Sequence, residues 1–239
     1  MLTAACMAHP QDEANPQPQS IYAKPAIKSG FKKATRYHGI NAPDGQLKDS
    51  LDRLEREANA GDSKAAASVY AGLVACKTMS LSTVKIDFNN RCAGVSDAEM
   101  AASGQWIEQA AREGNPAAQY VYASTGFEEI VGKDVTSDAG KSAYQNYVVT
   151  ARKYLNDLSH QCNVDAINQI SRDAWSGGSL FGGRDAAATA YTYAVIYTTV
   201  GNADNSDKLL AALEGKLSPS DNAAQLRQSA ESFVHQYCQ

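Results

Sequence analysis

The sequence predicts an all-α protein, arranged as a solenoid of about three antiparallel helix pairs with a helical cap at the C-terminal end. From about Asp49 onward the chain is rich in alanine, has almost no strand patterning and holds only two prolines, Pro116 and Pro219. Long helices are therefore permitted. In the same region one pattern that ends a helix occurs three times, at intervals typical of stacked helix pairs.

Composition excludes several classes of protein. The chain has 239 residues, of which 44% are hydrophobic and 20% charged, which is ordinary for a globular domain with a real core. Its net charge of −4 argues against nucleic acid as the main partner. The charge is uneven, with +2 over residues 1–50 and −6 over the remainder. No apolar run approaches the roughly 20 residues that a membrane helix needs, so we expect no transmembrane segment.

Residues 1–45 are expected to form a flexible N-terminal tether with a basic arm. The residues Met1-Leu2-Thr3-Ala4-Ala5-Cys6 resemble the end of a bacterial lipoprotein signal, in which the cysteine becomes lipidated. This resemblance implies that Cys6 anchors the chain to the outer membrane and that residues 7–20 are the tether, with three prolines keeping it extended. The alternative is an ordinary disordered terminus with a stray cysteine.

The basic arm runs from Lys24 to Arg36 and contains five cations without an acid. Two interpretations are open. The arm is either a solvated linker or a contact with anionic lipid headgroups beside the anchor.

Three turns define the body, residues 46–239. Each places a helix end at a glycine-like position, then an Asp or Asn suited to cap the next helix, then an alanine that lets two helices approach closely. Gly61 and Gly114 suit the left-handed conformation that ends a helix, whereas Cys162 does not, so the third turn is expected to be irregular. The residues in the three turns are Gly61, Asp62 and Ala65; Gly114, Asn115 and Ala118; Cys162, Asn163 and Ala166.

Further residues extend the pattern: Trp106, Ala110, Ala111 and Gln119 around the second turn, and Ile170, Ser171, Trp175, Gly177, Arg184-Asp185 and Ala190-Tyr191 after the third. At these residues, over about 51–199, the chain resembles the Sel-one-like repeat family, a relative of the tetratricopeptide repeats. The resemblance implies a right-handed solenoid with units near 48–76, 97–132, 142–177 and 185–204 and a cap over 205–239. A generic helical bundle is the alternative.

Cysteine spacing predicts two disulfides in the body. Cys76 and Cys92 lie 16 residues apart and are expected to pin an irregular insertion over 77–95. By elimination Cys162 pairs with Cys238 and staples a last helix over about 222–237. Four cysteines allow three pairings, so the other pairings stay open. An even number of body cysteines suggests an oxidising compartment, while buried thiols in a cytosolic protein are the alternative.

Two further breaks are expected. A second, softer loop covers 132–141. Before the last helix, a short amphipathic helix covers 208–216 and ends at a break in which Ser218 caps a helix with Pro219 at its first position.

We expect no catalytic residue, no metal and no cofactor. The four histidines, His9, His38, His160 and His235, fit no metal or catalytic motif, and the glycines from 177 to 183 fit neither a phosphate loop nor a nucleophile elbow. Tyrosine suits recognition surfaces because its ring is rigid and amphipathic. The candidate binding surface therefore consists of Tyr120, Tyr122, Tyr191, Tyr193 and Tyr197, although packing between helix pairs also explains them.

Together these features predict a protein–protein interaction module without catalysis, acting as a scaffold or adaptor. We expect it in the bacterial periplasm, anchored to the outer membrane, or secreted. Its expected partner is another protein, with no nucleic acid. Two alternatives follow from the same resemblance: an immunity lipoprotein that neutralises a rival's secreted toxin, and an enzyme that binds cell-wall fragments or a β-lactam. A purely structural envelope protein is a further possibility.

Overall fold

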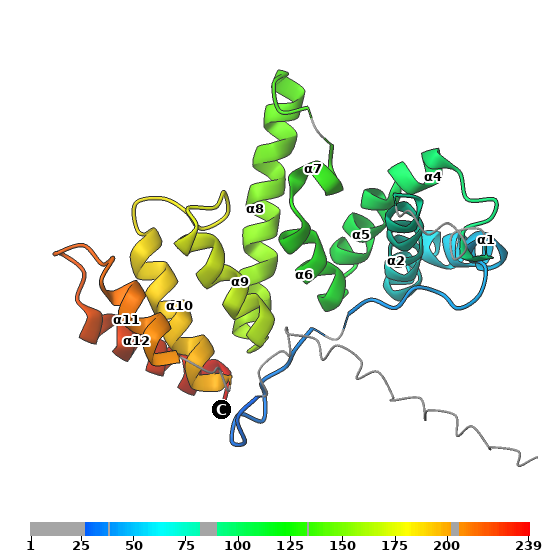
Figure 1. Cartoon of the computed structure of the whole chain (residues 1–239). Coiled ribbons are helices and arrows are strands. Elements are labelled where there is room, and N and C mark those ends of the chain that lie inside the picture. Colours follow the sequence, from blue (N-terminus) through cyan, green and yellow to red (C-terminus); the bar gives the residue numbers. More distant parts are fainter. Residues whose placement is uncertain (1–26, 38, 82–89, 133, 202–205) are drawn as a thin grey trace, which may run out of the picture.

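The computed structural model describes residues 27–37, 39–81, 90–132, 134–201 and 206–239 (Figure 1). Helices are the only regular elements among these residues, apart from two isolated β-bridges, which agrees with the predicted all-α class. Cys6, the proline-containing tether, His9 and His38 lie outside the described residues.

Short turns join several consecutive helices, and longer segments separate others. In chain order they are α1 (Leu47–Asn59), α2 (Ser63–Ser80), α4 (Asp97–Ala101), α5 (Ser103–Arg112), α6 (Pro116–Thr125), α7 (Phe127–Ile130), α8 (Asp138–His160), α9 (Val164–Trp175), α10 (Ala186–Val200), α11 (Ser206–Glu214) and α12 (Ala223–Tyr237).

The three predicted turns share one geometry. Asp62, Asn115 and Asn163 each cap the following helix with the side chain, as predicted. The backbone N–H of the same three residues donates to the carbonyl five residues earlier, at 2.9–3.0 Å, which is the hydrogen bond of a Schellman motif. The alanines at the fixed offset, Ala65, Ala118 and Ala166, are buried.

The third turn is less irregular than expected. Cys162 has a φ of 54°, in the same left-handed region as Gly61 (97°) and Gly114 (87°). A side chain in this region costs of the order of 1 kcal/mol. The surrounding structure holds it there, since Cys162 is fully buried and its carbonyl accepts a 3.0 Å hydrogen bond from the N–H of Thr35.

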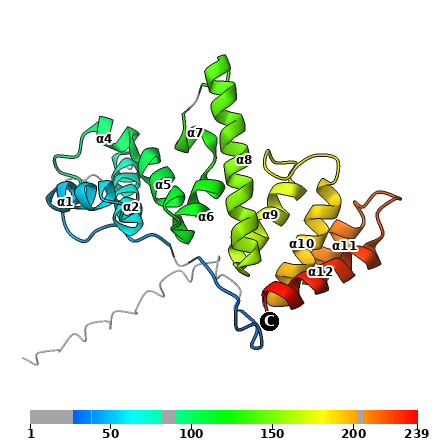
Figure 2. The ribbon, with the colours of Figure 1, turned by 180° about the vertical axis from the view of Figure 1, so that it is seen from behind.

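Contacts between helices that are near one another in the chain connect α1 to α12, and they include α2 with α5, α6 with α8 and α10 with α12. Figures 1 and 2 show the resulting row, with the 23-residue helix α8 standing near its middle. Two hydrophobic cores run through it. The first joins buried residues of α1, α2, α4, α5, α6, α7, α8 and α9, and the second joins those of α9, α10, α11 and α12.

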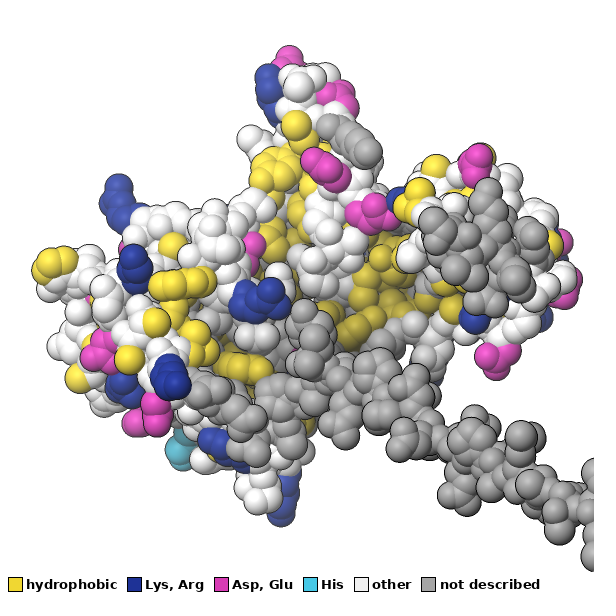
Figure 3. Space-filling model, viewed as in Figure 1, with side chains coloured by type: hydrophobic (Ala, Val, Ile, Leu, Met, Phe, Trp, Pro, Cys, Tyr) yellow, Lys and Arg dark blue, Asp and Glu magenta, His cyan; other side chains and the backbone are white. Residues whose placement is uncertain are grey.

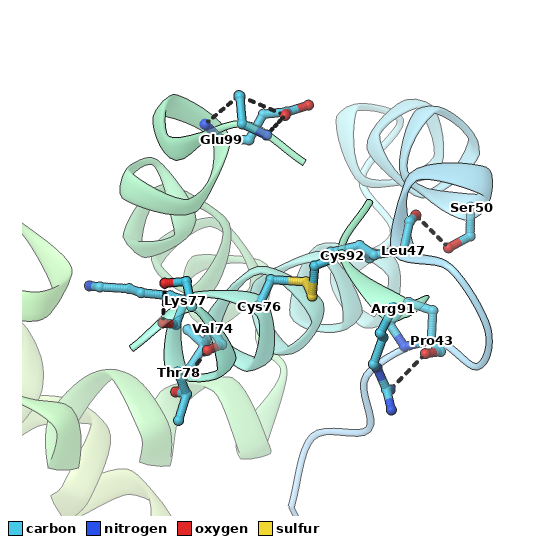
Figure 4. Close-up of a disulfide and its surroundings, with 12 residues drawn as sticks. Pro43, Leu47, Ser50, Val74, Cys76, Lys77, Thr78, Arg91, Cys92 and Glu99 are labelled. Atoms are coloured by element: carbon cyan, nitrogen blue, oxygen red, sulfur yellow. Dashed lines mark hydrogen bonds between the residues drawn. A yellow bond between two sulfur atoms is a disulfide. The ribbon is translucent and has the colours of Figure 1, made fainter. Parts of the chain in front are cut away.

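Both disulfides join the pairs that spacing predicted. Cys76 bonds to Cys92 and Cys162 to Cys238, with Cα atoms 5.6 Å and 5.1 Å apart. All four cysteines are buried. Figure 4 shows the first bond between α2 and the segment that returns toward α4.

Three loop predictions need correction. Residues 77–80 belong to α2, because the hydrophobic contacts of that helix with the first core continue as far as Met79. The helix α8 begins at Asp138, inside the expected loop 132–141. Ser218 does not cap a helix: it sits in a turn bonded to Asp221, and Asn222 caps α12.

The prediction that residues 1–45 form a flexible tether is wrong in part, because the later residues of this segment pack on the body. Ile27 forms an antiparallel bridge with Gly201 and Thr35 a parallel bridge with Asn163. We call the described residues between 27 and 46 the strap. In Figure 1 it runs along the helix row from the C-terminal end toward α1. Its half-buried Ile27, Phe31 and Ala34 contact the second core.

The strap also contacts the first two helix pairs. Tyr37 packs against Tyr120 of α6, with ring centroids 5.0 Å apart. Further along, the carbonyl of Pro43 accepts a 2.9 Å hydrogen bond from Arg91, next to the first disulfide (Figure 4). A side chain in place of Gly72 on α2 would collide with Leu47 of α1 and press against Pro43 of the strap, so the small residue lets both approach.

Candidate binding cleft around α7

The five predicted tyrosines do not form a common surface. Tyr122 and Tyr191 are only 4% and 0% exposed, so the prediction that they bind a partner is wrong. They belong to different cores, Tyr122 to the first and Tyr191 to the second. The helix faces that carry these two tyrosines pack against neighbouring helices, which bury the rings.

The remaining three tyrosines are half-buried and already packed. Tyr120 contacts the strap through Tyr37, and Tyr193 packs edge-on against Phe233 at 6.0 Å. Tyr197 lies beside Arg36 of the strap. Burial raises the pKa of all three, that of Tyr120 to about 12. They act as internal packing residues.

A hollowed surface lies elsewhere, on both sides of the short helix α7. Two cavities of about 600 and 580 Å³ meet there, and both are lined by Glu128 and Glu129. We call these two cavities together the α7 cleft. The first lies among α6, α7, α8, α9 and the loop after α9, and the second among α2, α4, α5 and α7.

Close backbone packing and aromatic contacts hold α7 in place. Gly104 of α5 lies against the carbonyl groups of Glu129 and Ile130, where any side chain would collide with backbone. On the other side Phe127 packs edge-on against Tyr144 and Tyr147 of α8, with centroids 5.2 and 5.7 Å apart. The hydroxyl of Tyr147 donates to the carbonyl of Tyr122 at 3.2 Å.

The glycine-rich loop after α9 forms one wall of the first cavity. Arg152 of α8 donates hydrogen bonds to the carbonyls of Ser179 and Leu180. Asp173 of α9 accepts a hydrogen bond from the backbone N–H of Phe181 at 2.5 Å. Sequence reasoning treated this stretch only as a loop, and it had no signal that α8 and α9 would fix it beside α7.

Carboxylates dominate the charge of the cleft. Among the residues that the structure describes, four carboxylates line it, Asp97, Glu128, Glu129 and Asp173, against one cation, Lys77. The ammonium of Lys77 lies 2.6 Å from Glu129, which ties α2 to α7. Burial raises the pKa of Tyr147 to about 12 and raises that of Tyr122 as well, so both hydroxyls stay protonated near neutral pH. They contribute packing and hydrogen bonds rather than a nucleophile.

Hydrophobic side chains remain exposed beside these carboxylates. Val131, which lines the second cavity, is 42% exposed, and Val135, which lines the first, is 45% exposed. Figure 3 shows hydrophobic side chains in the hollow between α8 and the lobe that carries α4, with acidic side chains near its margin. An exposed apolar hollow with polar surroundings is typical of a binding site.

Metal chemistry finds no support in the described part of the chain, which holds no group of three or more His, Cys, Asp or Glu side chains placed to bind an ion. His160 stacks on Tyr237, with centroids 4.5 Å apart, and also contacts Phe233. None of the helices within the described residues is long and apolar enough to cross a bilayer.

Searches of protein-family models, of curated proteins and of solved structures each returned no match.

Proposed function

We propose that this chain is a non-catalytic protein–protein interaction module of the periplasm, built from about three Sel-one-like helix pairs and a cap, and that it docks a partner in the α7 cleft. The single observation that carries the docking site is the pair of adjoining cavities with Val131 and Val135 exposed at their edges. A scaffold or adaptor that inserts side chains of its partner into such cavities needs no reactive group.

The shared geometry of the three turns supports the repeat architecture. Hydrogen bonds also join the first pair to the second: Gln109 of α5 donates to the carbonyl of Ala58 at 2.7 Å, and Asn115 donates to that of Ser63 at 3.4 Å. Stacking of one pair on the next in this way is how solenoids extend a binding surface.

The two buried disulfides support an oxidising compartment, since such bonds are rare in reducing ones. The periplasm is the proposed location. Cys6 lies outside the described part of the chain, so anchoring through this residue is proposed from the sequence alone.

Photo-crosslinking from inside the cleft tests this function. A photoreactive residue replaces Val131 or Val135 in the full chain, expressed in the cells that produce it. Val149, which is 67% exposed on α8 and lines neither cavity, is the matched control position. We expect one defined protein adduct from positions 131 and 135 and none from 149.

The identity of the adduct separates the alternatives. An envelope protein of the same cell indicates an adaptor, and a rival's toxin supplied from outside indicates an immunity protein. Crosslinking to wall fragments or to a β-lactam instead of a protein would favour the alternative that the chain is a ligand-binding enzyme. Equal labelling from all three positions, or none from any, would contradict docking in the cleft.

A further inference from the structure

The α7 cleft combines three features that select one class of partner: unbalanced carboxylates, a half-buried aromatic ring in the cavity wall and exposed valines. On this basis we propose that the cleft binds an extended cationic segment of the partner protein, in which arginine or lysine alternates with aliphatic residues. This inference rests on the proposed docking function and specifies the chemistry of its partner.

The first feature is charge. Lys77, the one cation among the described residues that line the cleft, is already paired with Glu129. Within the described residues Glu128 makes no ion pair, and its side chain is exposed between the two cavities. A cation entering the cleft therefore gains a carboxylate without displacing an existing partner. An acidic segment would meet repulsion from both sides of α7.

The second feature is aromatic. Tyr144 lines the first cavity and is half-buried, and its ring packs edge-to-face against Phe127. A guanidinium or ammonium group that reaches the face of such a ring is attracted by the negative charge of the π-system. Tyr144 and Glu128 line the same cavity, so one cationic side chain can use both.

The third feature is the apolar edge. Val131 lines the second cavity and Val135 the first. Both are exposed, so aliphatic side chains of an extended segment can bury them. Successive side chains of an extended chain alternate in direction, and alternation of cationic and aliphatic residues presents each kind on one face. The two cavities are each large enough for side chains, at about 600 and 580 Å³.

The test uses blocked heptapeptides in which leucine alternates with arginine, and matched versions with glutamine or glutamate replacing arginine. Binding to the disulfide-intact full chain is measured by titration calorimetry at low and high salt. We expect the arginine peptide to bind roughly tenfold more tightly than the glutamine peptide, with the advantage shrinking as salt rises. The glutamate peptide should bind least.

Variants locate the effect. Glu128→Gln should weaken binding of the arginine peptide about fivefold, the effect of one partly exposed charge. Tyr144→Ala should weaken it further, and Tyr144→Phe should restore it because the ring face is kept. Glu231→Gln, at an exposed position on α12, is the matched control and should change nothing. Circular dichroism confirms that each variant is folded.

Equal affinity for the arginine and glutamine peptides, or no effect of Glu128→Gln, would overturn cation recognition while leaving docking in the cleft intact. Absence of binding by every peptide, with a crosslinked adduct still formed from Val131 or Val135, would overturn the inference and not the proposed function. If no peptide binds and no crosslinked adduct forms, the inference and the proposed docking function are both overturned.

Discussion

Arg36 and Asp165 lie 129 residues apart in the sequence, yet their side chains form an ion pair of 3.2 Å that fastens the strap to the start of α9. The same carboxylate accepts the backbone N–H of Tyr37 at 2.7 Å. Both side chains are largely buried, at 12% and 8% exposure. A pair of this kind fixes the position of the strap along the helix row, because any shift would leave a buried charge without its partner.

Removal of this carboxylate should loosen the strap. We expect Asp165→Asn to lower the free energy of unfolding by about 3 kcal/mol, because the guanidinium of Arg36 stays buried without a counter-charge. Urea denaturation measures the loss. Trypsin should also cut faster at Lys28, Lys32 and Lys33. Asp185→Asn, at an exposed carboxylate without a capping bond, is the control. Unchanged stability and cleavage would show that the ion pair does not hold the strap.

The two disulfides should differ in their contribution to stability. Cys162–Cys238 closes 76 residues and Cys76–Cys92 closes 16, so the chain-entropy estimate gives about 4 and about 3 kcal/mol. Paired alanine substitutions, compared by urea denaturation, should therefore cost more at the C-terminal bond. That variant should also expose α12 to proteolysis, because the bond holds its end. A larger loss from the Cys76 and Cys92 pair would contradict this ranking.

The second turn depends on the conformational freedom of glycine. Gly114 has a φ of 87° and open space around its Cα, so Gly114→Ala meets no neighbour but is strained in the backbone. We expect a loss of about 1 kcal/mol in the free energy of unfolding. Gly215→Ala is the matched control, because Gly215 lies outside the left-handed region and has room for a methyl group. Equal effects at the two glycines would refute the conformational argument.

Glu99 should make stability depend on pH. Hydrogen bonds from Lys48 and from Ser96 lower its pKa from 4.5 to about 2. A lowered carboxyl pKa stabilises the folded chain above the unfolded value, and this contribution is lost as pH falls from about 4.5 toward 2. Glu99→Gln keeps a side chain able to complete the capping box and removes the charge.

We therefore expect Glu99→Gln to be less stable than the natural chain at pH 7, by up to about 1 kcal/mol, with the difference shrinking on acidification. Urea denaturation at pH 7, 5 and 3.5 measures it. Ser96→Ala removes the cap itself and serves for comparison. A difference between Glu99→Gln and the natural chain that stays constant with pH would contradict the assignment to the charged pair.

The sequence by itself determined the features that depend on neighbouring residues. The helix ends at Gly61 and Gly114 and the caps at Asp62, Asn115 and Asn163 could be predicted because each is made within one turn of chain. The pairing of the disulfides was predicted as one of three that the sequence allows, since the short separation of Cys76 and Cys92 favours that pair and leaves one remaining pair in the body.

Only the tertiary structure decided which side chains the packed helices leave accessible. Tyr122, Tyr191 and Tyr144 are all tyrosines, yet the first two are buried and Tyr144 is half-buried at the wall of a cavity, because burial depends on which helix packs opposite. The strap and the α7 cleft are set in the same way, by contacts such as Arg36 with Asp165 and Lys77 with Glu129. Contacts between residues so far apart are fixed by how helices pack, and no local pattern records that packing.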